Sequence, residues 1–134
     1  MTQTYQGSCH CGRIRFEADI DLAAGTSRCN CTYCSKSRWW GATVKPSAFR
    51  LLSGAGETTD YRFNTRQGTH GFCRTCGLSA YAEGDVPQIG GAFVAINVAC
   101  LDGVAPEVLA ALPVHYCDGL HDNWMHPPAV TSYL

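Results

Sequence analysis

Seven of the nine cysteines of this chain lie in three short clusters, and their spacing constrains the fold more than any other feature. Thiolates that bind one zinc ion at about 2.3 Å must lie within about 4 Å of one another. Residues two or three positions apart satisfy that condition in a bent strand or a tight turn. The cysteines of these clusters are therefore predicted to be zinc ligands. The three clusters are Cys9-His10-Cys11, Cys29-Asn30-Cys31-Thr32-Tyr33-Cys34 and Cys73-Arg74-Thr75-Cys76-Gly77.

The number of thiols in each cluster carries further information. A structural zinc site uses four protein ligands, whereas a catalytic site uses three and leaves one position to water or substrate. The two outer cysteine pairs together supply four sulfurs, and the middle cluster supplies three by itself. The sequence therefore predicts one closed and one open zinc site. A disulfide framework is disfavoured, because the cysteines are odd in number and Cys-x-Cys pairs form strained disulfides.

Length and charge exclude several classes of protein. A chain of 134 residues fits a single domain, here 1–134, and is long enough to bury a core without a metal. The formal net charge is −1, from 10 basic and 11 acidic residues, with no run of like charge. We therefore expect neither a nucleic-acid groove nor a membrane-binding patch. Because no export signal and no stretch of about eighteen apolar residues occurs, we expect a soluble, cytoplasmic protein.

Strand patterns dominate the chain. Apolar residues from Ile14 to Ile20 alternate with charged ones, which predicts a half-buried strand directly after the first cysteine pair. The apolar run over 90–98 predicts a central strand. One short helix is predicted over 106–112, with a proline in its first turn and Pro113 behind it. Further short strands are predicted at 39–44, 49–52 and 59–63, and the whole pattern predicts a compact, mostly β domain.

Several short motifs resemble one known family over nearly the whole chain. In order, they are Gly7-Ser-Cys-His-Cys-Gly12, Cys29-Asn-Cys-Thr-Tyr-Cys-Ser35, Arg66-Gln-Gly, Phe72-Cys-Arg-Thr-Cys-Gly77, Leu101-Asp102 and Pro106. The pattern resembles the glutathione-dependent formaldehyde-activating enzyme family, also called the centromere-protein-V-like domain. This resemblance implies an Mss4-like fold of twisted antiparallel sheets clasped by a structural zinc.

The resemblance also implies a role for each cluster. It implies that the outer pairs hold the structural zinc and that the middle cluster holds a second, more labile, catalytic zinc. The structural ligands would be Cys9, Cys11, Cys73 and Cys76. The catalytic ligands would be Cys29, Cys31 and Cys34. The implied activity is that of a carbon–sulfur lyase, which joins formaldehyde and glutathione into S-(hydroxymethyl)glutathione, so the implied partner is a small-molecule thiol or thiol adduct.

An open zinc site suits a thiol substrate. A bound dication lowers the pKa of a thiol and polarises a carbonyl oxygen. Three thiolates leave the site net negative, which favours thiol exchange over the activation of water. Glutathione carries two carboxylates, and guanidinium groups are suited to bind them. The cations that flank the second and third clusters are Arg28, Lys36, Arg38, Arg66 and Arg74.

The remaining unusual residues have simpler interpretations. Bulky Trp39 and Trp40 stand where the family has small residues, and on one strand they would face opposite sides, so at most one would line a pocket. His10 is expected to be exposed. The tail histidines His115, His121 and His126 are expected to form hydrogen bonds in loops. Cys100 and Cys117, outside the clusters, are expected to pack as small hydrophobic residues.

Two alternatives to an enzyme remain open on the sequence. The chain could be a non-enzymatic zinc domain that binds a protein partner, with both metals structural. It could also be a redox or metal-buffering module whose middle cluster consists of reactive thiols. An open coordination position in a cleft favours the enzyme, whereas a fourth protein ligand or a flat apolar face over the middle cluster favours the interaction domain.

Overall fold

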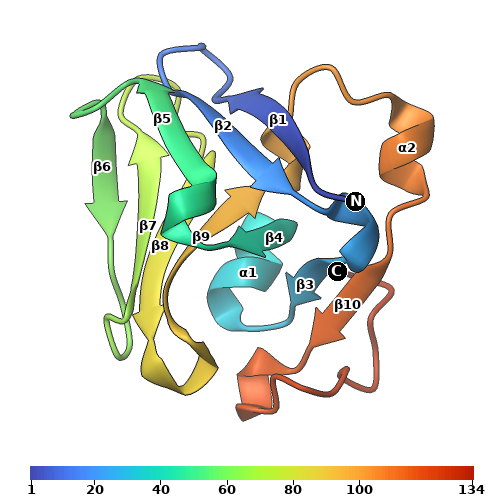
Figure 1. The fold of residues 1–134 in the computed structure, drawn as a ribbon. Helices are drawn as coiled ribbons and strands as arrows, with labels where there is room; N and C mark the ends of the chain where they lie inside the picture. The colour runs from blue at the N-terminus through green and yellow to red at the C-terminus, as the bar shows by residue number, and fades with distance from the viewer.

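A computed structural model describes residues 1–134 as two β-sheets with two short α-helices (Figure 1). The smaller sheet has the strand order β1-β2-β5, and the larger has the order β10-β3-β4-β9-β8-β7-β6. The strands are β1 Gln3–Ser8, β2 Arg15–Ile20, β3 Thr26–Cys29, β4 Gly41–Val44, β5 Phe49–Ser53, β6 Thr58–Tyr61, β7 Gly68–Cys73, β8 Tyr81–Val86, β9 Gly91–Asn97 and β10 Val114–Cys117. The α-helices are α1 Thr32–Ser37 and α2 Pro106–Ala110, and the 3₁₀ helices are η1 Leu22–Ala24, η2 Pro46–Ala48, η3 Pro87–Ile89, η4 Val98–Cys100 and η5 Gly119–His121.

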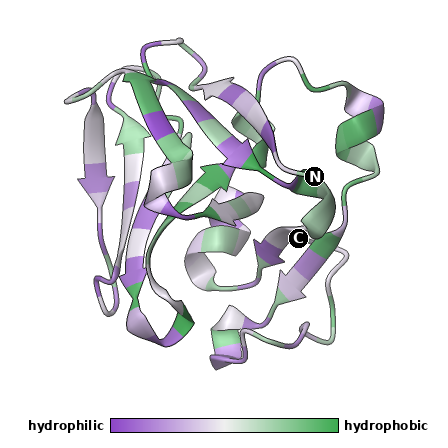
Figure 2. Cartoon of the chain, viewed as in Figure 1, coloured by the Kyte–Doolittle hydropathy of each residue, from purple (hydrophilic) through white to green (hydrophobic).

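The hydrophobic core lies where one face of β2 meets β4 and β9. Phe16 is fully buried on β2, and Val94 and Ile96 are buried on β9. Hydrophilic and hydrophobic residues alternate along several strands (Figure 2), because successive strand residues point to opposite faces of a sheet. The aromatic rings of Phe49 and Tyr81 lie 5.6 Å and 6.3 Å from that of Phe16, measured between centroids. The core thus joins the two sheets.

The predicted mostly β class is confirmed, and each predicted strand overlaps an observed one. Two details differ from the expectations. The strands β3 and β10 pair in parallel, so the larger sheet is mixed rather than purely antiparallel. The prediction of a single helix is wrong, because α1 forms within the middle cysteine cluster. The six residues of α1 are too few to show an apolar periodicity. The N-terminus of the helix is capped by Cys31, whose sulfur accepts a hydrogen bond from the backbone N–H of Cys34.

The predicted helix at 106–112 is present as α2, which starts at Pro106 as expected and ends at Ala110. Neither α-helix has the length and apolar character needed to cross a membrane.

Gly54 positions the loop that carries the first cysteine pair. Its φ is +95°, and a Cβ at this position would lie 2.7 Å from the carbonyl oxygen of Arg13 and 2.9 Å from Cα of Ile14. The nearby Gly56 also has a positive φ of +78°, but no atom lies within 4 Å of where its Cβ would be. Alanine substitutions at Gly54 and Gly56 can therefore distinguish the energy of an unfavourable backbone conformation from the energy of a steric clash.

We expect Gly54→Ala to lower the free energy of unfolding by about 3 kcal/mol and Gly56→Ala by only about 1 kcal/mol. Both variants carry the strain of a positive φ, whereas only Gly54→Ala forces the 13–14 backbone to move. Urea unfolding followed by circular dichroism would measure the difference. Equal losses in the two variants would contradict the close approach at Gly54.

Candidate metal centres

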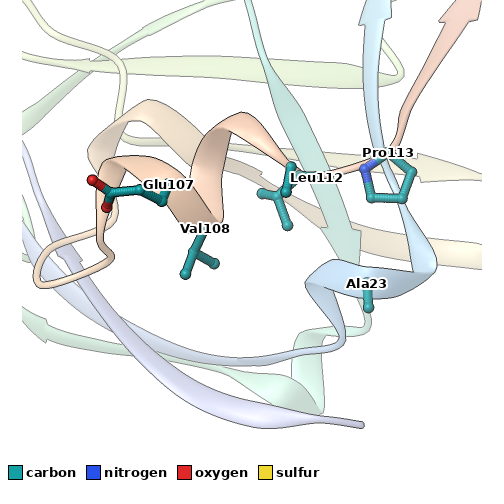
Figure 3. Close-up of a pocket in the computed structure, with 6 residues that line it drawn as sticks. Ala23, Glu107, Val108, Leu112 and Pro113 are labelled. Carbon is teal, nitrogen blue, oxygen red and sulfur yellow. The ribbon is translucent and has the colours of Figure 1, made fainter.

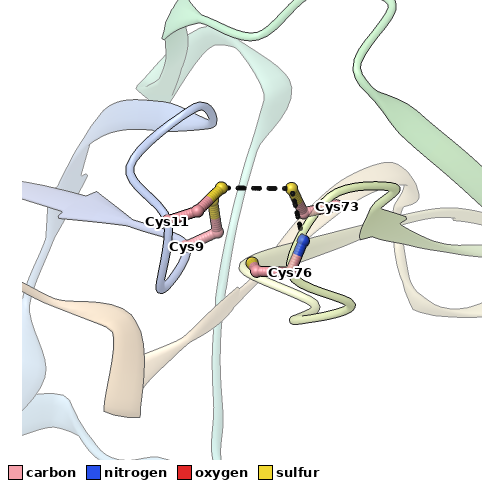
Figure 4. Close-up of side chains that lie close together, drawn as sticks. All are labelled: Cys9, Cys11, Cys73 and Cys76. Atoms are coloured by element: carbon pink, nitrogen blue, oxygen red, sulfur yellow. Dashed lines mark hydrogen bonds between the residues drawn. The ribbon is translucent and has the colours of Figure 1, made fainter.

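The two outer cysteine pairs, more than sixty positions apart in the sequence, meet in space (Figure 4). Cys9 and Cys11 lie in the loop after β1, and Cys73 and Cys76 lie at and beyond the end of β7. Their four sulfurs all lie within 4.8 Å of one another, and the Cys9–Cys11 and Cys11–Cys73 sulfur pairs are each 3.6 Å apart. Tetrahedral zinc with thiolates at about 2.3 Å requires sulfurs about 3.8 Å apart. The four thiols therefore fit one zinc ion.

Each pair is held by a turn of the same kind. The backbone N–H of Cys9 donates to the carbonyl of Ile14 and that of Cys73 to Leu78, five residues onward in both cases. Each turn contains a glycine with positive φ, Gly12 at +81° and Gly77 at +79°. The sequence left a bent strand and a tight turn open for these pairs, and both pairs lie in tight turns.

Backbone donors point at these sulfurs. The N–H of Ile14 donates to Cys9 Sγ at 3.4 Å, and the N–H of Cys76 donates to Cys73 Sγ at 3.5 Å. The latter bond is the main reason that the pKa of Cys73 falls below its usual value. Backbone hydrogen bonds, the largest from Cys11, lower the pKa of Cys76 to about 6. These donors favour the thiolate forms of Cys73 and Cys76, and the thiolate is the form that binds a metal.

The middle cluster forms a separate group of three thiols. Cys29 ends β3, Cys31 caps α1 and Cys34 lies within α1. The three sulfurs lie within 4.8 Å of one another, and no histidine, carboxylate or fourth thiol lies that close to all three. The N–H of Cys31 donates to Cys29 Sγ at 3.4 Å, and the N–H of Cys34 donates to Cys31 Sγ at 3.3 Å. The group fits a metal with one coordination position free of protein ligands.

The three thiols of this group shift one another's pKa values. The neighbouring thiols of Cys29 and Cys34 hold the pKa of Cys31 below its usual value. The thiol of Cys31 is the main cause that raises the pKa of Cys29, and the thiols of Cys29 and Cys31 raise the pKa of Cys34. Three sulfurs this close repel one another as thiolates, so a cation would be needed to stabilise all three in that form.

The residues around the middle cluster follow the predictions in part. Arg38 and Trp39 lie beside Cys29 and Cys34, together with Arg28, whereas Trp40 packs against the core and donates its indole N–H to Thr26 Oγ1 at 2.7 Å. As predicted, only one of the two tryptophans borders this space. By contrast, Arg74 pairs with Glu57 at 3.2 Å on the surface, and Arg66 is exposed on the loop before β7. Arg28 and Arg38 are therefore the arginines of the middle site.

Most of the histidines and the other cysteines lie as expected. His10 is exposed, and His121 and His126 form loop hydrogen bonds with Asp118 and Asn123. His115 differs from the expectation, because it lies exposed on the strand β10 and not in a loop. Cys100 is buried and Cys117 is half-buried, and neither joins a thiol group.

Two grooves that the sequence did not predict lie away from the thiols. One, of about 460 Å³, is lined by Tyr33, Lys36, Tyr61 and Phe63 on the face of α1 opposite to Cys31 and Cys34. Its rings stack on one another and on His70, with 4.1 Å between the Tyr33 and His70 centroids. These residues are scattered over 33–70, so no pattern in the sequence predicted this groove.

The second groove, of about 520 Å³, lies between α2 and η1 (Figure 3). Val108 and Leu112 point toward the space that Ala23 borders, and Glu107 also lines it. No cysteine lines this groove, so its chemistry is separate from that of the metal centres.

With this geometry in place, comparison with known proteins decides the family. A sequence profile described as glutathione-dependent formaldehyde-activating enzyme matches residues 4–117, which include all seven clustered cysteines. The chain belongs to this family. The crystal structure of a protein from Rhodobacter sphaeroides is similar to it, with 34% sequence identity and a TM-score of 0.69, over 82% of this chain and 99% of that chain. The match to this family ends at residue 117, so it does not include the tail of the chain.

Proposed function

We propose that the protein is a zinc-dependent carbon–sulfur lyase that forms and breaks the adduct of a thiol and an aldehyde, S-(hydroxymethyl)glutathione synthase-like in its reaction. The observation that carries this proposal is the group of three thiols without a fourth protein donor, in a chain of the formaldehyde-activating family. A closed site could not accept a substrate sulfur, whereas three thiols leave one of four coordination positions without a protein ligand.

We further propose a ligand set for each metal. Cys9, Cys11, Cys73 and Cys76 would hold a structural zinc, and Cys29, Cys31 and Cys34 would hold the second zinc. When bound at the second site, zinc lowers the pKa of a substrate thiol and polarises an aldehyde oxygen. The backbone N–H groups of Cys31 and Cys34 keep their acceptor sulfurs oriented. Arg28 and Arg38 supply positive charge for a substrate carboxylate.

The reaction balances without an external oxidant or reductant. In the forward direction the thiol sulfur forms a bond to the aldehyde carbon, and the carbonyl π bond breaks. The proton that leaves the sulfur ends on the former carbonyl oxygen, which becomes a hydroxyl group. The product is a hemithioacetal, and the reverse reaction cleaves the same carbon–sulfur bond.

The interaction-domain alternative makes a different demand on the middle cluster. It requires a fourth protein ligand or a flat apolar face over the three thiols. The three-thiol group has no fourth ligand, and the residues beside it include two arginines. These observations support the enzyme over the interaction domain.

The test must separate catalysis from the uncatalysed addition. We expect zinc-loaded protein to accelerate the exchange of 2-mercaptoethanol with its hydroxymethyl adduct about tenfold or more, which corresponds to about 1.4 kcal/mol of barrier. Nuclear magnetic resonance exchange spectroscopy with formaldehyde would measure the rate, in proportion to protein concentration. Glutathione serves as a second thiol, and S-methylglutathione, which has no thiol, serves as the blank.

Two variants serve as controls for this experiment. Cys34→Ser should remove the acceleration, and Cys117→Ser, which alters a cysteine outside the group, should keep it. Exchange at the uncatalysed rate with both thiols, in protein shown to contain two zinc ions, would refute the proposed activity.

A further inference from the structure

The tail formed by residues 118–134 lies against the three-thiol group, although it is outside the family match. Its first part is fixed by Asn30, a buried residue between two of the thiols. The Asn30 side-chain amide donates to Asp118 Oδ1 at 2.8 Å and accepts from the backbone N–H of Leu120 at 3.0 Å. Both ends of the amide are thereby used to hold the tail next to Cys29.

This anchoring brings the tail backbone into contact with a thiol. A Cβ on Gly119 would lie 2.6 Å from Cys29 Sγ and 2.6 Å from the Trp124 ring. The glycine therefore allows residues 119 and 124 to pack where any other side chain would clash. One side of the three-thiol group is covered by this part of the tail.

A second contact is made by the last residues of the tail. The Arg38 guanidinium donates from Nη1 to the carbonyl oxygen of Tyr133 at 3.1 Å. Arg38 follows α1 with a left-handed φ of +53°, which ends the helix and turns the chain away from it. The tail is thus attached to the same helix that carries Cys34.

Leu134 then closes the space beside the thiols. It borders this space together with Cys29, Cys34 and Trp39, and the gap that remains is too narrow for a water molecule. The groove on the other face of α1 has no thiol among its lining residues, which are 32, 33, 36, 37, 61 and 63. A ligand that approaches Cys29 and Cys34 through this space must displace Leu134 or fit beside it.

We propose that the tail is a specificity element, in which Leu134 admits small thiols to the three-thiol metal site and disfavours bulky ones such as a tripeptide thiol. The proposal rests on the proposed function and specifies its substrate class: thiols of two or three carbons and their aldehyde adducts. A small thiol needs only a limited shift of one leucine side chain. Glutathione would require residues 133 and 134 to leave and would lose the Arg38–Tyr133 hydrogen bond.

Cobalt-substituted protein provides a test that does not depend on activity. The visible absorption of Co²⁺ bound to thiolates changes when a further sulfur binds, and only a metal with a free position responds to added thiol. Titration with 2-mercaptoethanol and with glutathione gives two dissociation constants for each protein. The ratio of the two constants measures discrimination and is insensitive to changes that affect both thiols equally.

The variants remove the cover in two independent ways. One lacks residues 130–134, and the other is Leu134→Gly in the full chain, so that a folding defect in the first leaves the second to decide. The matched control is Val130→Gly, which alters an exposed side chain of the same tail. We expect the affinity for glutathione, divided by the affinity for 2-mercaptoethanol, to be about tenfold or more higher in both tail variants than in the unaltered protein. The ratio should stay unchanged in the control.

The two proposals fail in different ways in this experiment. If both thiols bind and the ratio is the same in all four proteins, the specificity role of Leu134 is wrong and the thiol-binding function stands. If neither thiol changes the cobalt spectrum of any protein, the open site does not accept thiols, and the proposed function fails together with the specificity role.

Discussion

Cys73→Ser should leave the chain unable to fold stably and should abolish binding of the first zinc ion. Cys73 is fully buried, and its sulfur faces Cys11 Sγ at 3.6 Å between the two turns. Binding of a structural zinc contributes about 10–16 kcal/mol, which is comparable to the total stability of about 5–15 kcal/mol of a folded domain. Because a zinc ion bound by these four thiols would join the loop after β1 to the end of β7, its loss would separate segments that are distant in the sequence.

Thermal unfolding followed by circular dichroism, with zinc measured by elemental analysis, would test this expectation. The matched control is Cys117→Ser, because Cys117 is half-buried but belongs to neither thiol group. We expect the control to retain both zinc ions and to lose about 1 kcal/mol. A soluble Cys73→Ser protein with the melting temperature of the control would show that the outer pairs do not share a structural metal.

Cys34→Ser should have the opposite pattern, with the fold retained and about one zinc ion lost per chain. The three thiols lie within six consecutive residues, so a metal bound there links little of the chain. The local loop that it closes is short, and the surrounding strands pair independently of it through the backbone bonds of β3 with β4 and β10. Function should be lost although stability is largely kept.

Zinc content and melting temperature, measured on the same preparation, would distinguish this variant from Cys73→Ser. We expect a stoichiometry near one instead of near two, and a change in the free energy of unfolding of about 1–2 kcal/mol. A Cys34→Ser protein that retained two zinc ions would remove Cys34 from the ligand set. One that melted as early as Cys73→Ser would make the middle site structural.

The strength of sequence reasoning here lay in short-range chemistry. The cysteine spacings and the alternation from Ile14 to Ile20 both involve residues only a few positions apart. Such patterns predict local geometry because the residues that make it are neighbours along the chain. The first and third clusters, the strand β2 and the helix α2 were recognisable for this reason.

The helix α1 marks the limit of such reasoning. Its six residues have no hydrophobic repeat, and it is stabilised by the Cys31 cap and by its position on β3. The sequence also did not decide which of the two rings, that of Trp39 or that of Trp40, would face the middle site. Only the packing of Trp40 on the core and its bond to Thr26 decided which one does.

Tertiary structure alone decided where distant segments meet. The sequence by itself determined that two thiol groups with four and three members were available. Packing of the two sheets on one core brought the Cys11 and Cys73 sulfurs to 3.6 Å, and the Asn30 amide and Arg38 brought the tail to the middle group. No pattern within the tail predicts these contacts, because each depends on a partner about ninety positions away whose location is set by the sheets and not by the neighbouring residues.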